Sequence, residues 1–193
     1  MGLTIYYGGS FNPSASLQQM IEEVVEIAKV YHWKYTIYES NFPEAEFEPI
    51  PNEKIYGAIF TPPDCEPVFL TFLSNGRMSS SINLAFFGNS SKKENQQYLY
   101  MLSTKTQFAG IKIHMLIIHL LRYLTNKYCQ TFSLTDEGRY WETGDVKLLE
   151  ETFNRYNLLL NSVADVLDIF PMLPGETIEE HLTRLFVRIH KKR

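Results

Sequence analysis

The sequence predicts an α+β fold: a mainly antiparallel sheet with a split βαβ, ferredoxin-like core, inserted strands and C-terminal helices. Two observations lead to this expectation. Short segments rich in β-branched and aromatic residues recur between residues 3 and 134, as is typical of strands. Longer segments carry apolar residues at helical spacing, over 17–31, 111–128, 146–170 and 178–189.

The N-terminal segment reads as a βαβ unit. Residues 3–7 form the first expected strand, which the glycines at 8–9 end in a turn. The helix over 17–31 follows a capping box and carries a regular apolar stripe. Residues 34–39 alternate as a second strand, and the stretch 41–51, rich in Pro and Glu, is expected to be a solvated loop.

The middle of the chain reads as further strands around one buried helix. Strands are expected over 55–61, 68–73, 82–87 and 98–103, which makes a sheet of six or seven strands. The segment 111–128 is apolar on nearly every side, so it predicts the central helix.

The C-terminal part is expected to be helical. A short strand over 131–134 is followed by an acidic and aromatic turn over 136–145, and then by two helices. We therefore expect a sheet domain over 1–145 and a helical pair over 146–193, which together form one compact unit.

Composition excludes several function classes. The 193 residues carry a formal net charge of -4, so the basic field that binds nucleic acid is not expected. The longest apolar run, 115–121, is far shorter than the roughly 20 residues that a membrane span needs. Cys65 and Cys129 lack metal-ligand spacing, so a reduced cytoplasmic protein without a cofactor is expected.

A glycine-rich segment is the first candidate site. Gly8–Pro13 (GGSFNP) resembles the start of the nucleotidylyltransferase signature of the nicotinate mononucleotide adenylyltransferase family. In that family these residues lead into a His-x-Gly-His element that binds nucleotide phosphates, but here 14–17 read SASL. A turn and a helix N-cap are therefore expected, with phosphate binding at the helix N-terminus as a hypothesis.

An acidic and aromatic segment is the second candidate. Residues 136–145 (DEGRYWETGD) hold four carboxylates and two large aromatics. One interpretation is that they cap the following helix; the other is a polar recognition surface or a site for a hard metal ion. The residues proposed for recognition are Asp136, Glu137, Tyr140, Trp141 and Glu142.

The loop before the central helix is the third candidate. Lys105 and Gln107 lie between a strand end and a helix start, where open sheets often place binding groups. His114 follows on the helix, while His119, five positions later, points in another direction. If the loop after 131–134 lies on the same rim, these side chains and the acidic segment share one cleft.

Two of these segments resemble those of a group of uncharacterised bacterial proteins. The resemblance consists of 105–110 (KTQFAG), a histidine-bearing helix, and 136–145 (DEGRYWETGD). It implies a bacterial cytoplasmic origin and carries no assigned activity.

The function expected from these residues is non-catalytic. The leading hypothesis is a regulatory or immunity-like binding protein that takes a protein partner or small polar ligand at the predicted cleft. The alternative is a metal-assisted hydrolase or transferase that uses Asp136, Glu137, Glu142 and His114. Whether the chain is an enzyme, which metal it would bind and its oligomeric state stay open at this point.

Overall fold

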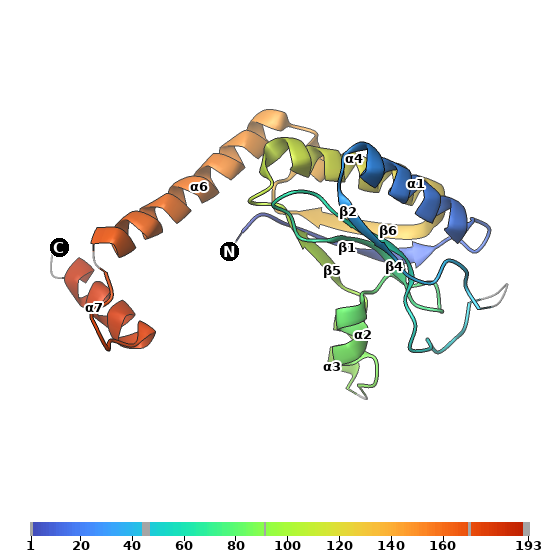
Figure 1. Cartoon of the computed structure of the whole chain (residues 1–193), viewed down its shortest axis with the longest axis horizontal. Coiled ribbons are helices and arrows are strands. Elements are labelled where there is room, and N and C mark those ends of the chain that lie inside the picture. The colour runs from blue at the N-terminus through green and yellow to red at the C-terminus, as the bar shows by residue number, and fades with distance from the viewer. Residues whose placement is uncertain (1, 44–46, 91, 170, 191–193) are drawn as a thin grey trace. The chain divides into compact units, whose positions relative to one another are not determined.

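The computed structural model describes residues 2–43, 47–90, 92–169 and 171–190, and these residues form an α+β fold (Figure 1). The strands belong to two three-stranded antiparallel sheets. The chain divides into two compact units, Met1–Phe153 and Asn154–Arg193. The α+β class and the mainly antiparallel pairing predicted from the sequence are confirmed.

The first sheet is built around the N-terminal strand. Strand β1 (Thr4–Phe11) lies between β5 (Leu102–Lys105) and β6 (Cys129–Asp136), antiparallel to both. The expected turn at 8–9 is wrong, because both glycines lie inside β1. A Cβ atom at Gly9 would stand 2.2 Å from the carbonyl oxygen of Thr131, so the close approach of β6 requires glycine here.

The second sheet adjoins the first along β4 and β5. It has the order β2 (Lys34–Ile37), β3 (Tyr56–Thr61), β4 (Val68–Phe72). The amide of Phe69 in β4 donates to the hydroxyl of Tyr7 in β1 at 2.7 Å, and the hydroxyl of Thr104 in β5 donates to the carbonyl of Pro67 at 2.8 Å. These polar links join the sheets side by side.

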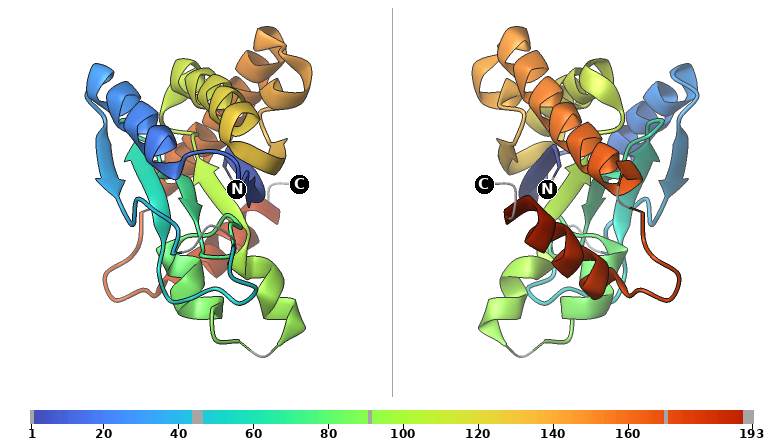
Figure 2. Two further views of the ribbon diagram at one scale, coloured as in Figure 1. Left: turned by 90° about the vertical axis from the view of Figure 1, so that its right-hand side faces the viewer. Right: turned by 90° about the vertical axis from the view of Figure 1, so that its left-hand side faces the viewer.

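Two helices cover one side of the sheets. Helix α1 (Leu17–Val30) packs on β3 and α4 (Gly110–Tyr128) packs on β6, and both views in Figure 2 show them on the same side. The apolar stripe of α1 is buried, and Ser16 caps the helix by accepting a hydrogen bond from the amide of Gln19. The predicted helices over 17–31 and 111–128 are confirmed.

A helical hairpin replaces one expected strand and shortens another. Residues 82–87 lie in α2 (Ser81–Phe87), so that strand prediction is wrong. The strand expected over 98–103 is present only from Leu102, where β5 begins, because 98–99 lie in α3 (Lys93–Leu99). The hydroxyl of Ser80 accepts the amide of Asn83 at 3.1 Å, which starts α2 as an N-cap. No residue of α2 is buried, so this helix has no continuous buried face that would show as an apolar stripe in the sequence.

The ferredoxin-like core is not confirmed. A split βαβ unit requires its two strands in one sheet, separated by a third strand. Here β1 and β2 belong to different sheets, and the sheets have three strands each instead of six or seven in one.

Three helices follow β6. They are α5 (Tyr140–Thr143), α6 (Val146–Ile169) and α7 (Ile178–His190); residue 170 of the predicted helix lies outside the described residues. A capping box starts α7, since Thr177 and Glu180 exchange hydrogen bonds. In this C-terminal unit Arg184 donates hydrogen bonds to both carboxylate oxygens of Glu176, and this lowers the pKa of Glu176 to about 2. Within the described residues, no helix combines the length and apolarity needed to cross a membrane.

We predict that Gly9→Ala lowers the free energy of unfolding by about 2 kcal/mol, because the new methyl group must push β6 away from β1. Urea denaturation followed by circular dichroism measures the change. Ser133→Ala, at an exposed position of β6, is the control and should change stability by less than about 0.5 kcal/mol. Equal stability of the two variants would contradict the close β1–β6 approach.

Candidate functional site

The two predicted loops begin at the same end of the first sheet, where β5 and β6 finish beside the start of β1. Strands β5 and β6 both run antiparallel to β1, with Lys105 opposite Thr4 and Asp136 opposite Ile5. Successive residues of a strand point to opposite faces, so the side chains of Lys105 and Asp136 lie on opposite faces of the sheet. The backbones of the two loops are brought together, but these two side chains do not line one cleft.

A buried polar network lies at this end of the sheet, on the face that α4 covers. The Nε2 atom of His114 lies 3.1 Å from Oδ2 of Asp136, and its Nδ1 atom lies 2.7 Å from the hydroxyl of Thr106. The His114 and Thr106 residues are 0% exposed. An ionised carboxylate only accepts hydrogen bonds, so Nε2 donates to Asp136, while the Thr106 hydroxyl lies between Nδ1 of His114 and the carbonyl of Leu3, 3.3 Å away.

Asp136 also organises the turn into α5. Its Oδ1 atom accepts the amide of Gly138 at 2.7 Å, and its Oδ2 atom accepts the amides of Tyr140 and Trp141 at 2.8 and 3.1 Å. Burial alone raises the pKa of Asp136, but hydrogen bonds and charge from His114 and the amides outweigh it, so the pKa is lowered. The carboxylate is therefore committed to holding the backbone.

The other carboxylates of the acidic segment also bind backbone amides. Glu137 accepts the amide of Thr4 at 2.8 Å, and Glu142 accepts the amide of Asp136 at 3.2 Å. Asp145 caps α6 by accepting two amides of its first turn at 2.9 and 3.2 Å. The capping interpretation is confirmed. In the part of the chain that the structure describes, no three His, Cys, Asp or Glu side chains form a metal-ligand group.

The two aromatic residues of the segment face α4. Tyr140 is buried, and its hydroxyl lies 3.2 Å from Nε2 of His119, which is exposed. Trp141 is half-buried between the ring of Phe132 in β6 and the guanidinium group of Arg122, which stands 4.7 Å from the Trp141 ring centroid. The aromatic residues thus join α5 to the sheet and to α4.

Lys105 and Gln107 lie beside the start of β1. A Cβ atom at Gly2 would meet the Lys105 and Gln107 side chains at 2.4 and 2.3 Å. The Lys105 ammonium group lies 5.4 Å from the Phe108 ring centroid. Gln107 is buried, and its amide group makes no hydrogen bond to another described residue. These two side chains pack around the N-terminal segment, away from the buried network.

The two thiols are not activated nucleophiles. Both cysteines are free and half-buried. Burial, together with the negative charge of Glu66, raises the pKa of Cys65 to about 12, and burial raises that of Cys129 to about 12. Both thiols therefore stay protonated at neutral pH.

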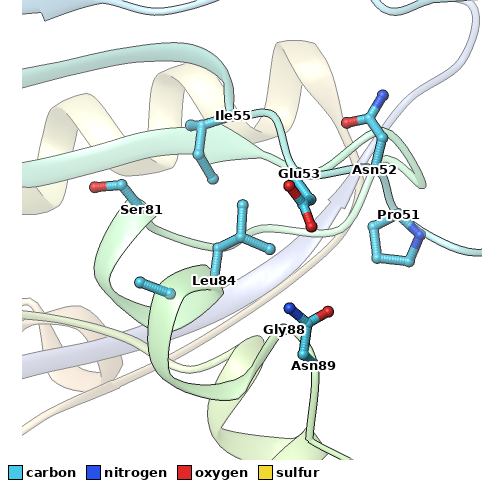
Figure 3. A pocket seen from close by; sticks show the side chains of 9 residues that line it. Pro51, Asn52, Glu53, Ile55, Ser81, Leu84, Gly88 and Asn89 are labelled. Atoms are coloured by element: carbon cyan, nitrogen blue, oxygen red, sulfur yellow. The ribbon is translucent and has the colours of Figure 1, made fainter.

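The structure shows a groove that the sequence did not predict. Its first cavity, of about 370 Å³, lies between the segment 51–55 and α2. Figure 3 shows Glu53 and Asn89 pointing into this space from its two walls, with the apolar side chains of Ile55 and Leu84 beside them. The volume falls in the range of small-ligand and peptide pockets.

A second cavity, of about 410 Å³, adjoins the first, since Pro51 and Gly88 line both. It contains Arg77, whose guanidinium carbon stands 3.3 Å from the Tyr100 ring centroid. Arg77 is exposed and forms no ion pair with another described residue. We call the two cavities together the α2–α3 groove.

The floor of the groove rests on a small apolar cluster. Ile55, Leu73 and Leu99 are buried at its centre, and Leu84 and Phe87 pack against them. The sequence did not predict the groove, because the residues of α2 and the end of α3 were expected to form the strands 82–87 and 98–103. The Ser80 and Asn83 pair, which forms the N-cap of α2, is the sequence signal that could have indicated the helix.

Comparison with known proteins adds no assignment. No family model, curated protein or solved structure matches the chain. The resemblance of the segments 105–110 and 136–145 to bacterial proteins therefore stays a prediction.

We predict that Asp136→Asn lowers the free energy of unfolding by about 3 kcal/mol. The NH2 group of asparagine at the Oδ2 position would face N–H donors, whereas the carboxylate oxygen accepts hydrogen bonds from them. Thermal and urea denaturation measure the loss. Asp145→Asn makes the same change in the same segment and should cost less than about 1 kcal/mol, since asparagine also caps helices. A similar loss in both variants would contradict the buried network.

We also predict a pH dependence that Asp136 causes. Its folded-state pKa lies below the ordinary value of 3.8, so the ionised carboxylate stabilises the fold above about pH 4. This contribution is lost as the pH falls through the lowered value. Urea denaturation of the native chain and of Asp136→Asn between pH 7 and pH 3 should give a difference in stability that shrinks with acid; a constant difference would contradict the assignment.

Proposed function

We propose that the chain is a non-catalytic interaction protein of regulatory or immunity-like role that binds an extended segment of a partner polypeptide in the α2–α3 groove. The observation that carries the proposal is the groove itself: two adjoining cavities with polar walls and an apolar floor. A small polar ligand of the same chemistry would occupy one cavity only.

The state of the acid and base groups supports a binding role. Asp136 and His114 are buried and bonded to each other, and Glu137 and Glu142 accept backbone amides. A general acid or base must reach a substrate proton, and a buried group with its bonding capacity in use does not. The metal-assisted hydrolase or transferase therefore has less support than the binding protein.

The lining of the groove matches a peptide. Amide side chains pair well with backbone N–H and C=O groups, and the groove presents Asn89, Gln96 and Gln97. Ile55 and Leu84 offer an apolar surface to a side chain of the ligand. An extended segment that alternates polar backbone and apolar side chains uses both kinds of contact.

Arg77 gives the groove a preference for an acidic residue. Stacking on Tyr100 holds the plane of the guanidinium group and leaves its edge donors free for a carboxylate. The same residue lines the second cavity, so a carboxylate of the ligand can reach it from the groove.

We predict that the capped peptide Ac-Ala-Leu-Glu-Ala-NH2 at millimolar concentration shifts the NMR amide signals of Gly88, Asn89 and Gln97. Arg77→Gln should weaken this binding about tenfold, which corresponds to about 1.4 kcal/mol for a charged hydrogen bond. Titrations followed by ¹⁵N–¹H spectra give both affinities.

The control variant is Lys29→Gln, which removes one positive charge from an exposed position on α1 and should leave the affinity unchanged. The glutamine peptide Ac-Ala-Leu-Gln-Ala-NH2 should bind the native chain about as weakly as the glutamate peptide binds Arg77→Gln. Signal changes confined to residues outside the groove, or an unchanged affinity in Arg77→Gln, would contradict the proposal.

A further inference from the structure

Strand β6 leaves one of its edges without a partner strand. It lies at the end of the order β5-β1-β6, so only one of its edges pairs with β1. The amide of Glu137 donates to the carbonyl of Thr4, which shows that odd-numbered positions turn their backbone groups toward β1. The amide of Asp136 donates instead to Glu142, on the other side. The even-numbered positions Phe132 and Leu134 therefore direct their N–H and C=O groups outward, whereas Gln130 lies at the bulge between the pairs Ser10–Thr131 and Phe11–Cys129, where the alternation is interrupted.

These outward groups are free within the described part of the chain. No hydrogen bond involves the backbone groups of Gln130, Phe132 or Leu134 apart from those of the strand itself. Glu142 occupies only the outward amide of Asp136, so it ends the free edge at one side. Phe132 and Leu134 thus offer the donors and acceptors that one further antiparallel or parallel strand would use.

Apart from the bulge between Cys129 and Thr131, the edge lacks the features that normally prevent strand pairing. Residues 129–135 contain no charged residue and no proline, and the strand is 8 residues long. The opposite outer strand, β2, has 4 residues and begins with Lys34. The edge of β5 meets β4, where the amide of Glu66 donates to the carbonyl of Lys105 at 3.1 Å. Among these edges, only that of β6 is long, uncharged and open.

The positive charge of Arg122 stands beside the open edge on the α4 side. Helix α4 contains no acidic residue, and of its other basic residues Lys127 forms an ion pair with Glu23. Arg122 stands over Trp141, which in turn packs against Phe132 at the middle of the edge. Arg122 donates to the carbonyl of Trp141 and forms no ion pair with another described residue. A strand laid along β6 would present alternate side chains to this guanidinium group.

We infer that β6 is an interaction surface that accepts an extended acidic segment of a partner polypeptide as an added strand, with a carboxylate of that segment bound by Arg122. The backbone groups of Phe132 and Leu134 provide the affinity, and Arg122 provides the preference for acidic side chains. This surface belongs to the first sheet and does not depend on the α2–α3 groove.

A second copy of this chain fits the edge less well. Antiparallel pairing of β6 with itself about Phe132 would bring the two Arg122 side chains toward each other on the same face. Like charges in that position are unfavourable, whereas an acidic strand compensates the charge. The charge of α4 therefore favours a different, acidic partner.

The experiment uses the full chain and the capped peptide Ac-Thr-Glu-Thr-Glu-Thr-Glu-Thr-NH2, whose glutamates share one face of a strand. We expect amide exchange at Phe132 and Leu134 to slow about tenfold at saturating peptide, while the amides at 131, 133 and 135 are already protected by β1. The peptide in which lysine replaces each glutamate should give no protection.

Two pairs of variants test the two parts of the inference. Leu134→Pro removes one outward donor at a half-buried position and should abolish the protection, whereas Leu134→Ala keeps the donor and should retain it. Arg122→Gln should weaken peptide binding about tenfold, whereas Lys112→Gln, the same loss of charge on α4, should not. Circular dichroism checks that each variant is folded, and Arg122→Gln still tests the inference if Leu134→Pro is not.

Three results would overturn the inference. The first is the absence of protection by the acidic peptide at millimolar concentration. The second is equal protection by the lysine peptide, which would remove the role of Arg122. The third is protection that rises with protein concentration alone, which would identify a second copy of the chain as the occupant.

Discussion

The hydrogen bond between Asp136 and His114 holds together the elements on which the N-terminal unit depends. It joins the end of β6 to the first turns of α4, and Thr106 extends it to the end of β5. Because Asp136 also accepts three backbone amides, the same carboxylate sets the direction of α5. A buried carboxylate is costly unless its bonding capacity is filled, and here protein donors fill it.

This arrangement separates the Asp136 and His114 pair from the surfaces available for binding. The Asp136 side chain faces α4, whereas the α2–α3 hairpin lies on the other side of the sheets (Figure 1). The groove and the β6 edge offer amide groups, aromatic faces and two arginines, Arg77 and Arg122, together with the carboxylate of Glu53 in the first cavity. Amides, aromatic faces and arginines recognise a ligand without reacting with it, so both surfaces support a role in interaction.

Long elements with a buried face were predictable, and short exposed ones were not. Helix α1 was predicted because its buried residues, from Leu17 to Ala28, repeat at helical spacing after the Ser16 cap. Helix α2 has no buried residue, so Ile82 and Phe86 suggested a strand although both are exposed in a helix. Gly9 was expected in a turn, because the sequence does not show that a neighbouring backbone approaches it within a strand.

The candidate site was predictable in its residues but not in their roles. A carboxylate followed by Gly138 and two aromatics is expected both of a recognition loop and of a capped turn, and only the direction of the side chain separates the two. That direction follows from register: Asp136 pairs with Ile5 and so shares its buried face, while one residue of slip would have placed it beside Lys105 on the other face. Register depends on β1, far away in the chain, and local sequence reasoning does not include that long-range pairing.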